Sequence, residues 1–200
     1  MKIGPRYKKA RYLGAPVFKK TQTQKYALRA QRKAKNVRRG ARSEYGRQML
    51  EKQKARFSYG VSGKQFTKYV TMALAAVGDN GKNLLQILES RLDNVVLRIG
   101  FAPSRAAARQ MVSHGHILVN GKKVTVPSYA VRTGDKITIR EGSKNKVIFS
   151  KLDEELKAVK WPAWVSVAID TREAKIEGQP TVDTSELLFD VRSVLEFYTR

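Results

Sequence analysis

The 200-residue sequence contains no cysteine, which excludes disulfide bonds and cysteine-based zinc sites. It also has no apolar run near the ~20 residues that a membrane-spanning helix needs. Its first residues, MKIGPRYKKARYLG, lack the apolar core of a secretory signal, so we expect mature protein in the cytoplasm. The two histidines, His114 and His116, have no cysteine or adjacent carboxylate beside them. We therefore expect no metal and no other cofactor.

Signatures of catalysis are missing as well. The chain has no cysteine nucleophile, no Gly-x-Ser-x-Gly segment and no phosphate-binding loop, and the fragment Gly121-Lys122 is too short to count as a nucleotide signature. Asp93 invites a reading as a catalytic acid, but a structural partner for a nearby cation or backbone group is the simpler interpretation. The sequence therefore predicts a protein that is not an enzyme.

Acidic residues are scarce where basic residues are dense. The chain carries 40 Lys and Arg against 17 Asp and Glu, and the first acid is Glu44. Residues 1–60 hold 19 basic and 2 acidic residues, whereas residues 151–200 hold 7 and 10. An excess this large repels itself in a free monomer, so it indicates a polyanionic partner. Nucleic acid is the first candidate and an anionic membrane surface the second.

The segment 1–43 shows no sustained apolar period and contains 15 cations and no acid. Alone in water, such a segment is expected to have little structure. Its aromatic residues, Tyr7, Tyr12, Phe18 and Tyr26, alternate with the cations. This pattern favours an RNA-binding arm, in which rings stack and cations meet phosphates, over a solvated tail.

Apolar stripes at helical spacing follow the arm. Ser43 is a candidate N-cap for a cationic helix, and the residues from Phe66 to Val77 repeat at i, i+3, i+4 and i+7. A further stripe starts at Leu84. The C-terminal segment DVRSVLEFYTR places an apolar face behind Asp190, a plausible cap, so we expect it to pack against the earlier helices.

The segment from Arg91 to Arg140 indicates two short helices followed by tightly turned strands. Gly100 ends the first helix, and the second starts near Ser104 and stops at Gly115. Asn120-Gly121 lies between apolar runs and predicts a hairpin, because both turn positions need a positive φ. The spacing of the cations in residues 91–140 places them on one surface. This favours RNA binding by these cations over the alternative of solvated surface charges.

Particular residues of this segment resemble a known RNA-binding module. They are Arg91-Leu92-Asp93, Ser104-Arg105, Ala108-Arg109, His114-Gly115, Val119-Asn120-Gly121 and Gly134-Asp135. The module is the helix-helix-hairpin type named after ribosomal protein S-four, and similar copies occur in pseudouridine synthases, tyrosyl-tRNA synthetases and a ribosome-binding stress protein. An enzyme of this kind needs a separate catalytic domain, and about fifty residues after the module are too few for one.

The flanking segments extend the resemblance to the ribosomal protein S-four family itself. They are 10–14, 51–66, 83–96 and the closing LEFYTR. Two departures exist: zinc-binding members carry a cysteine cluster that this chain lacks, and residues 36–39 replace the Pro-Gly-Gln-His-Gly turn of many other members. A free RNA chaperone or stress factor acting on ribosomal subunits is the alternative from a different functional class.

The resemblance implies an α+β fold in three parts. These are a basic arm (1–43), a mainly helical domain (44–89 with 151–200) and an inserted RNA-binding module (90–150). It implies a structural role in the small ribosomal subunit: primary binding of small-subunit ribosomal RNA, nucleation of assembly and a contribution to decoding accuracy with ribosomal protein S-five. Other small-subunit proteins and messenger RNA near the entry channel are further implied partners, and no membrane is.

The expected RNA contacts combine cations with a few polar and aromatic residues. Ser104 is expected to cap its helix and leave backbone N–H groups for a phosphate, and His114 lies at a helix C-terminus, where its charge suits the dipole. The expected contact residues are Arg38, Arg39, Arg42, Tyr45, Lys52, Lys54, Arg56, Lys64, Lys68, Arg91, Arg98, Ser104, Arg105, Arg109, His114, Asn120, Lys122 and Lys123.

Overall fold

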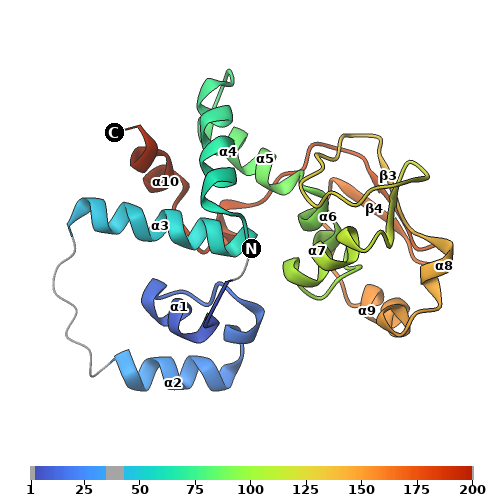
Figure 1. Cartoon of the computed structure of the whole chain (residues 1–200), viewed down its shortest axis with the longest axis horizontal. Coiled ribbons are helices and arrows are strands. Elements are labelled where there is room, and N and C mark those ends of the chain that lie inside the picture. The colour runs from blue at the N-terminus through green and yellow to red at the C-terminus, as the bar shows by residue number, and fades with distance from the viewer. Residues whose placement is uncertain (1–2, 35–42, 200) are drawn as a thin grey trace. The chain divides into compact units, whose positions relative to one another are not determined.

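A computed structural model describes residues 3–34 and 43–199 of the chain. The chain divides into two compact units, one formed by residues 1–84 with 183–200 and the other by residues 85–182 (Figure 1). Helices and an antiparallel sheet are both present, which confirms the predicted α+β class. No helix of the described residues combines the length and the apolar character that crossing a membrane requires.

The first unit consists of helices. In chain order they are α1 (Arg6–Leu13), the 3-10 turn η1 (Lys19–Thr21), α2 (Gln24–Ala34), α3 (Glu44–Tyr59), α4 (Gly63–Ala75), the first half of α5 (Asn80–Glu89), the 3-10 turn η3 (Thr184–Glu186) and α10 (Val191–Tyr198). Residues 35–42, between α2 and α3, lie outside the described part of the chain.

The basic segment at the N-terminus contains helices in the structure. Ala10 and Leu13 of α1 join Phe18 in an apolar cluster with Leu50 and Phe57 of α3. The expectation of little structure applies to the segment alone in water and stays a prediction; within the whole chain, residues 3–34 contain α1, η1 and α2. The physical reason is that α3 supplies the apolar surface that the segment lacks by itself.

The C-terminal helix α10 packs against α3, as its apolar face predicts. The Tyr45 and Phe197 rings lie 5.4 Å apart between the two helices. Asp190 caps α10 by accepting hydrogen bonds from the backbone N–H groups of Arg192 and Ser193, and Ser43 caps α3 in the same way through Gly46. Both caps were predicted from the sequence, because capping depends on residues close together in the chain.

The second unit combines short helices with a five-stranded antiparallel sheet of order β2-β1-β3-β5-β4. Its elements after α5 are α6 (Leu92–Ile99), α7 (Arg105–Ser113), β1 (Ile117–Val119), β2 (Lys122–Lys123), β3 (Lys136–Ile139), α8 (Glu141–Lys144), the 3-10 turn η2 (Val147–Phe149), α9 (Leu152–Lys157), β4 (Val165–Ala168) and β5 (Glu173–Ile176).

Alternate residues of the central strands face one continuous core. Ile117 is paired with Ile139, and Val119 with Ile137, across β1 and β3, and all four are buried. They share a cluster with residues of α6 and α7, which lie beside the sheet in Figure 1. The sheet therefore supports the two helices that carry the expected RNA contacts.

The units differ from the expected domains, because residues 3–34 share the first unit with α3 and residues 85–89 lie in the second. The sequence analysis assigned residues 151–200 to the helical domain, but β5 pairs with β3, and β4 with β5, so residues 151–182 belong to the second unit. Trp161 strengthens this arrangement by donating a hydrogen bond from Nε1 to the Ile99 carbonyl at 2.9 Å. Strand pairing at long sequence separation leaves no local signal, which is why the boundary was misplaced.

The two predicted glycine features are present. Asn120 and Gly121 both have positive φ values (50° and 76°) and join β1 to β2 as a tight hairpin. Gly100 has φ 98° at the end of α6. A Cβ there would lie 3.0 Å from a methyl group of Val159 and 3.2 Å from one of Leu156, so α9 and the residues just after it leave little space at this position.

His116, just before β1, is buried against Ser143 and Phe149. Its Nδ1 lies 2.9 Å from the Ser143 hydroxyl, and its ring meets Phe149 edge to face. Burial lowers the pKa of His116, and the nearby charges of Lys146, His114, Arg140 and Lys123 lower it further. The folded protein therefore favours the neutral imidazole.

We expect Gly100→Ala to reduce the free energy of unfolding by about 1–3 kcal/mol, because alanine disfavours a positive φ and its methyl group meets α9. Gly142→Ala is the matched control: Gly142 lies in α8 with open space where a Cβ would be, so this change should stabilise by up to about 1 kcal/mol. Denaturant unfolding of both variants measures the difference, and equal effects would contradict the role of Gly100.

His116 should make stability depend on pH. Its pKa is lower in the folded than in the unfolded state, where it is about 6.5. Between these two values the unfolded chain binds more protons, so the free energy of unfolding should fall as the pH falls below about 6.5. His116→Gln should reduce this slope, because it removes the group whose pKa differs between the two states. Identical slopes in urea unfolding of wild type and His116→Gln between about pH 5 and 7 would disprove it.

Candidate nucleic-acid interface

Four arginines of the second unit surround two buried carboxylates where α5 ends and α6 begins. We call this set the arginine cluster; it consists of Arg91, Arg98, Arg105, Arg109, Glu89 and Asp93. Residues up to twenty positions apart in the sequence meet here because α6 and α7 pack against each other. The cluster contains most of the arginines that the sequence analysis singled out in the module.

Glu89 is the centre of one half of the cluster. Its side chain has no exposed surface, and its Oε2 accepts hydrogen bonds from Arg98 Nε at 2.9 Å and from Asn94 Nδ2 at 2.8 Å. Arg105 Nη2 lies 3.9 Å from Glu89 Oε1, and Arg105 Nε donates to Asn94 Oδ1 at 2.7 Å. Asn94 therefore links Arg105 to the same carboxylate that holds Arg98.

Asp93 is the centre of the other half. Its Oδ1 accepts from Arg91 Nε at 3.0 Å, and its Oδ2 accepts from Arg91 Nη2 at 2.7 Å. The same Oδ2 accepts from Arg109 Nε at 2.9 Å and Nη2 at 2.6 Å. Asp93 is thus a structural partner of cations, as the sequence analysis proposed, and no reacting group is needed to explain it.

The four arginines differ in their access to solvent. The Arg91 side chain is 4% exposed, whereas those of Arg98, Arg105 and Arg109 are 24%, 27% and 26% exposed. The expectation that Arg91 contacts RNA is corrected: a buried guanidinium paired with Asp93 does not reach a ligand at the surface. The other three side chains are partly exposed, and the cluster as a whole has four positive and two negative charges.

The ends of α7 carry two further expected residues. The Ser104 hydroxyl accepts a hydrogen bond from the Ala107 N–H at 3.3 Å, so Ser104 caps the helix as predicted. His114 is the C-cap residue and is exposed. The two residues therefore lie at opposite ends of α7.

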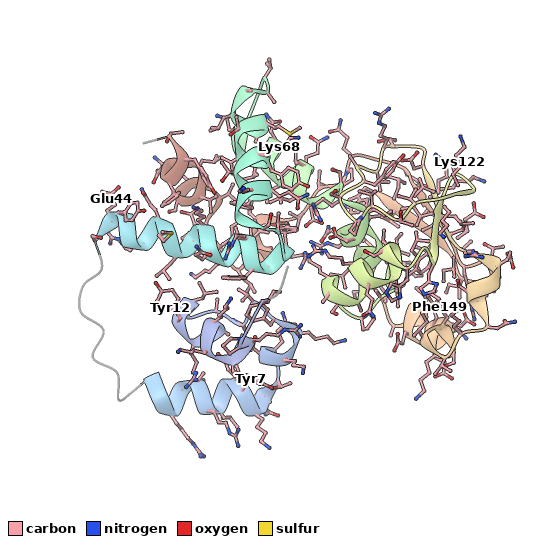
Figure 2. The ribbon with its side chains drawn as sticks, in the orientation of Figure 1. Tyr7, Tyr12, Glu44, Lys68, Lys122 and Phe149 are labelled. Carbon is pink, nitrogen blue, oxygen red and sulfur yellow. The ribbon has the colours of Figure 1, made fainter. Side chains whose placement is uncertain are left out.

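The hairpin of β1 and β2 exposes two lysines, whereas the Asn120 side chain forms hydrogen bonds within the protein. Lys122 and Lys123 are exposed, and Figure 2 labels Lys122. The end of the Lys123 side chain lies over Gly115, where a Cβ would require it to move. Asn120 donates from Nδ2 to Asp135 at 2.8 Å and accepts from the Lys136 N–H at 2.9 Å. Its amide therefore ties the turn to the start of β3, and its expected RNA contact stays a prediction.

In the first unit, two cations of α3 lie against aromatic rings. Lys52 Nζ is 4.2 Å from the centre of the Phe197 ring and 5.0 Å from that of Tyr198, and Arg56 lies 4.5 Å from the Phe57 ring. Burial lowers the pKa of Lys52, and the Arg56 charge adds to the effect. Burial also lowers the pKa of Arg56. The aromatic faces supply the negative potential that compensates these partly buried charges.

The other residues of this unit that were expected to contact RNA lie in different environments. Lys54 forms an ion pair with Glu51 at 2.6 Å, and Tyr45 is half exposed beside Phe197. Lys64 and Lys68 are four residues apart on α4 and both exposed (Figure 2). Arg38, Arg39 and Arg42 lie outside the described residues. No group of three or more metal-ligating side chains occurs among residues 3–34 and 43–199.

The sequence analysis missed Glu89 and Asn94. Glu89 is an acid next to the stripe of Leu85, Leu88 and Leu92, and a carboxylate at the edge of a buried stripe in a strongly basic chain requires a cationic partner. That signal could have been read. Which arginine pairs with the Glu89 carboxylate depends on how α6 and α7 pack, and the sequence does not show this packing directly.

Two family models match consecutive parts of the chain. Residues 1–89 match a model described as the ribosomal protein S4/S9 N-terminal domain, and residues 90–137 match the S4 domain. The five arginine-cluster residues other than Glu89 fall in the second match, and Glu89 is the last residue of the first.

Curated relatives agree with these matches over most of the chain. Small ribosomal subunit protein uS4 of Chromobacterium violaceum is 42% identical across 99% of this chain and 98% of its own length. The proteins of the same name from Cutibacterium acnes and Dehalococcoides mccartyi are 48% and 43% identical, each across 79% of this chain and 79% and 76% of their own lengths. The chain therefore belongs to the family of small ribosomal subunit protein uS4.

Proposed function

We propose that the chain binds small-subunit ribosomal RNA directly, early in assembly, through cationic surfaces on both of its units. As a member of its family it is a structural, non-enzymatic constituent of the small ribosomal subunit, located with that subunit in the cytoplasm. Binding of small-subunit ribosomal RNA follows from the same membership. The proposal concerns which residues bind and what the binding does.

The arginine cluster is the observation that carries the proposal. Arg98, Arg105 and Arg109 are partly exposed, fixed by hydrogen bonds and in excess over the two carboxylates. A guanidinium can bind two phosphate oxygens at once, and RNA duplexes are recognised mainly through phosphates, 2′-hydroxyls and shape. A rigid set of arginines suits this kind of recognition better than a code read from base edges.

Further contacts are proposed on both units. In the second unit they are Ser104, His114, Lys122 and Lys123, and in the first Tyr45, Lys52, Lys54, Arg56, Lys64 and Lys68, with Arg38, Arg39 and Arg42 as predictions from the sequence. The excess of cations in residues 1–60 provides the long-range attraction. The second unit then supplies a rigid shape against which the RNA is ordered.

The finer parts of the proposal concern the assembled subunit. We propose that the bound chain nucleates assembly, contacts ribosomal protein S-five and other small-subunit proteins, lies near the messenger entry channel and contributes to decoding accuracy. Family membership over nearly the full length of the chain supports these roles. A free RNA chaperone is the competing function.

Charge reversal at exposed lysines should weaken RNA binding. We expect Lys122→Glu with Lys123→Glu, and separately Lys64→Glu with Lys68→Glu, to raise the Kd for a 5′ fragment of small-subunit ribosomal RNA about tenfold or more at constant salt. If ~6–10 phosphates are neutralised, wild-type affinity should fall by roughly 10³–10⁵ between 50 and 200 mM salt, and each pair should reduce the slope. Filter binding over a salt series measures both quantities.

The control for these pairs is Lys151→Glu with Lys157→Glu, which makes the same charge change at two exposed positions at and before α9. Equal losses in the control and the two test pairs would reduce the effect to net charge. Circular dichroism verifies that each variant is folded. A wild-type affinity independent of salt would overturn the electrostatic part of the proposal.

A structural constituent should remain in the subunit where an exchanging chaperone would not. We expect the tagged chain to be present at one copy per small subunit after sedimentation through a high-salt sucrose gradient, because many simultaneous phosphate contacts are buried in the assembled particle. Quantitative mass spectrometry against other small-subunit proteins measures the ratio. Recovery mainly in the ribosome-free fraction would favour the chaperone.

A further inference from the structure

The buried carboxylates of the arginine cluster have a consequence for RNA binding that opposes simple electrostatics. A phosphate-binding face is expected to gain affinity when a negative charge is removed from it. Glu89 and Asp93 place two negative charges within 2.9 Å of the guanidinium groups proposed to bind phosphate. Their presence needs a reason beyond charge.

We propose that Glu89 and Asp93 are positioning residues, which fix the guanidinium groups of Arg98, Arg105 and Arg109 for phosphate binding before RNA arrives. This inference rests on the proposed RNA binding at the arginine cluster. It assigns the largest part to Glu89, which holds one arginine directly and a second through Asn94.

The first argument is burial. The Glu89 and Asp93 side chains are 0% and 2% exposed, so both carboxylates have lost their water and depend on arginine N–H groups for compensation. The arginines cannot leave without exposing an unpaired buried charge. Each guanidinium is therefore confined to one orientation in the free protein.

The second argument is conformational entropy. An exposed arginine loses much of its rotamer freedom when it binds a phosphate, and that loss weakens binding. In the arginine cluster this freedom is already lost on folding, since Arg98 Nε and Arg109 Nε each donate to a buried carboxylate at 2.9 Å. About a quarter of each side chain stays at the surface.

The two carboxylates hold different arginines. Asp93 is shared between Arg109 and the buried Arg91, so Arg91 acts through Asp93 and keeps that carboxylate in place. Glu89 accepts directly from Arg98, and Asn94 joins it to Arg105 by donating to the Glu89 carboxylate and accepting from Arg105. Removing the Glu89 charge should therefore release Arg98 and Arg105 but leave Arg109 fixed.

The decisive variant is Glu89→Gln, which keeps the size of the side chain and makes the protein one charge more positive. Net charge alone predicts equal or tighter RNA binding, whereas positioning predicts a Kd that rises roughly fivefold to tenfold, because the ordering of two long side chains is deferred to the binding step. Glu154→Gln makes the same charge change at an exposed position of α9 and should leave the Kd unchanged or slightly lower. The probe is the 5′ fragment of small-subunit ribosomal RNA, bound to the full chain at fixed salt.

A second measurement reads positioning directly in the free protein. Proton exchange at arginine Nε–H groups, followed by nitrogen–proton NMR, should be slow for Arg98, Arg105 and Arg109 in the wild type. Glu89→Gln should accelerate exchange at Arg98 and Arg105 only. If that variant fails to fold, Asn94→Ala tests the same link without a charge change, and it should accelerate exchange at Arg105 and weaken RNA binding.

A failure of positioning and a failure of RNA binding give different results in these variants. If Glu89→Gln binds RNA as tightly as the wild type or more tightly, while the Lys122 and Lys123 pair variant binds weakly, positioning is overturned and RNA binding stands. Weaker binding with unchanged exchange at Arg98 and Arg105 overturns positioning as well. If Glu89→Gln and both lysine pair variants bind like the wild type, the proposed RNA-binding surfaces are themselves wrong.

Discussion

The pairing of surplus arginine with buried carboxylate is the interaction on which the second unit depends. Glu89 and Asp93 lie at the junction of α5 and α6, where each apolar neighbour must be buried to form the core. Removing a carboxylate from water is unfavourable unless hydrogen-bonded cations replace the water. The arginines of α6 and α7 meet this requirement, and in doing so they set the orientation of both helices and the positive face that the two helices share.

The first unit has many cations and few acids, so its buried cations are stabilised in a different way. Residues 1–60 contain only two acids, and one of these, Glu51, already accepts from Lys54 and from the Asp190 N–H. Few carboxylates remain to pair with the other cations of α3. Aromatic rings stabilise Lys52 instead, because α10 places Phe197 and Tyr198 against it. The C-terminal helix therefore has an electrostatic role as well as an apolar one. It lets a strongly cationic helix pack without an equal number of acids.

Features set by neighbouring residues were predicted correctly from the sequence. The Asn120-Gly121 hairpin, the caps Ser43 and Asp190 and the end of α6 at Gly100 all depend on contacts within a few residues. The apolar stripe through Phe66 and Val70 correctly marked the buried face of α4. Features that join distant segments were missed or misplaced. Arg91 was expected at the surface and is buried, and residues 151–182 were expected in the other unit.

The sequence by itself determined the mixed fold class, the positions of most turns and helix ends, and the cationic character that indicates a polyanionic partner. Local hydrogen bonds, side-chain periodicity and net charge are all readable without knowing what lies across the core. Only the tertiary structure decided which cations are exposed and which are consumed in holding the fold together. The reason is that an arginine's role is set by the charge it meets, and in this chain Asp93 and Arg109 meet across sixteen residues through the packing of two helices.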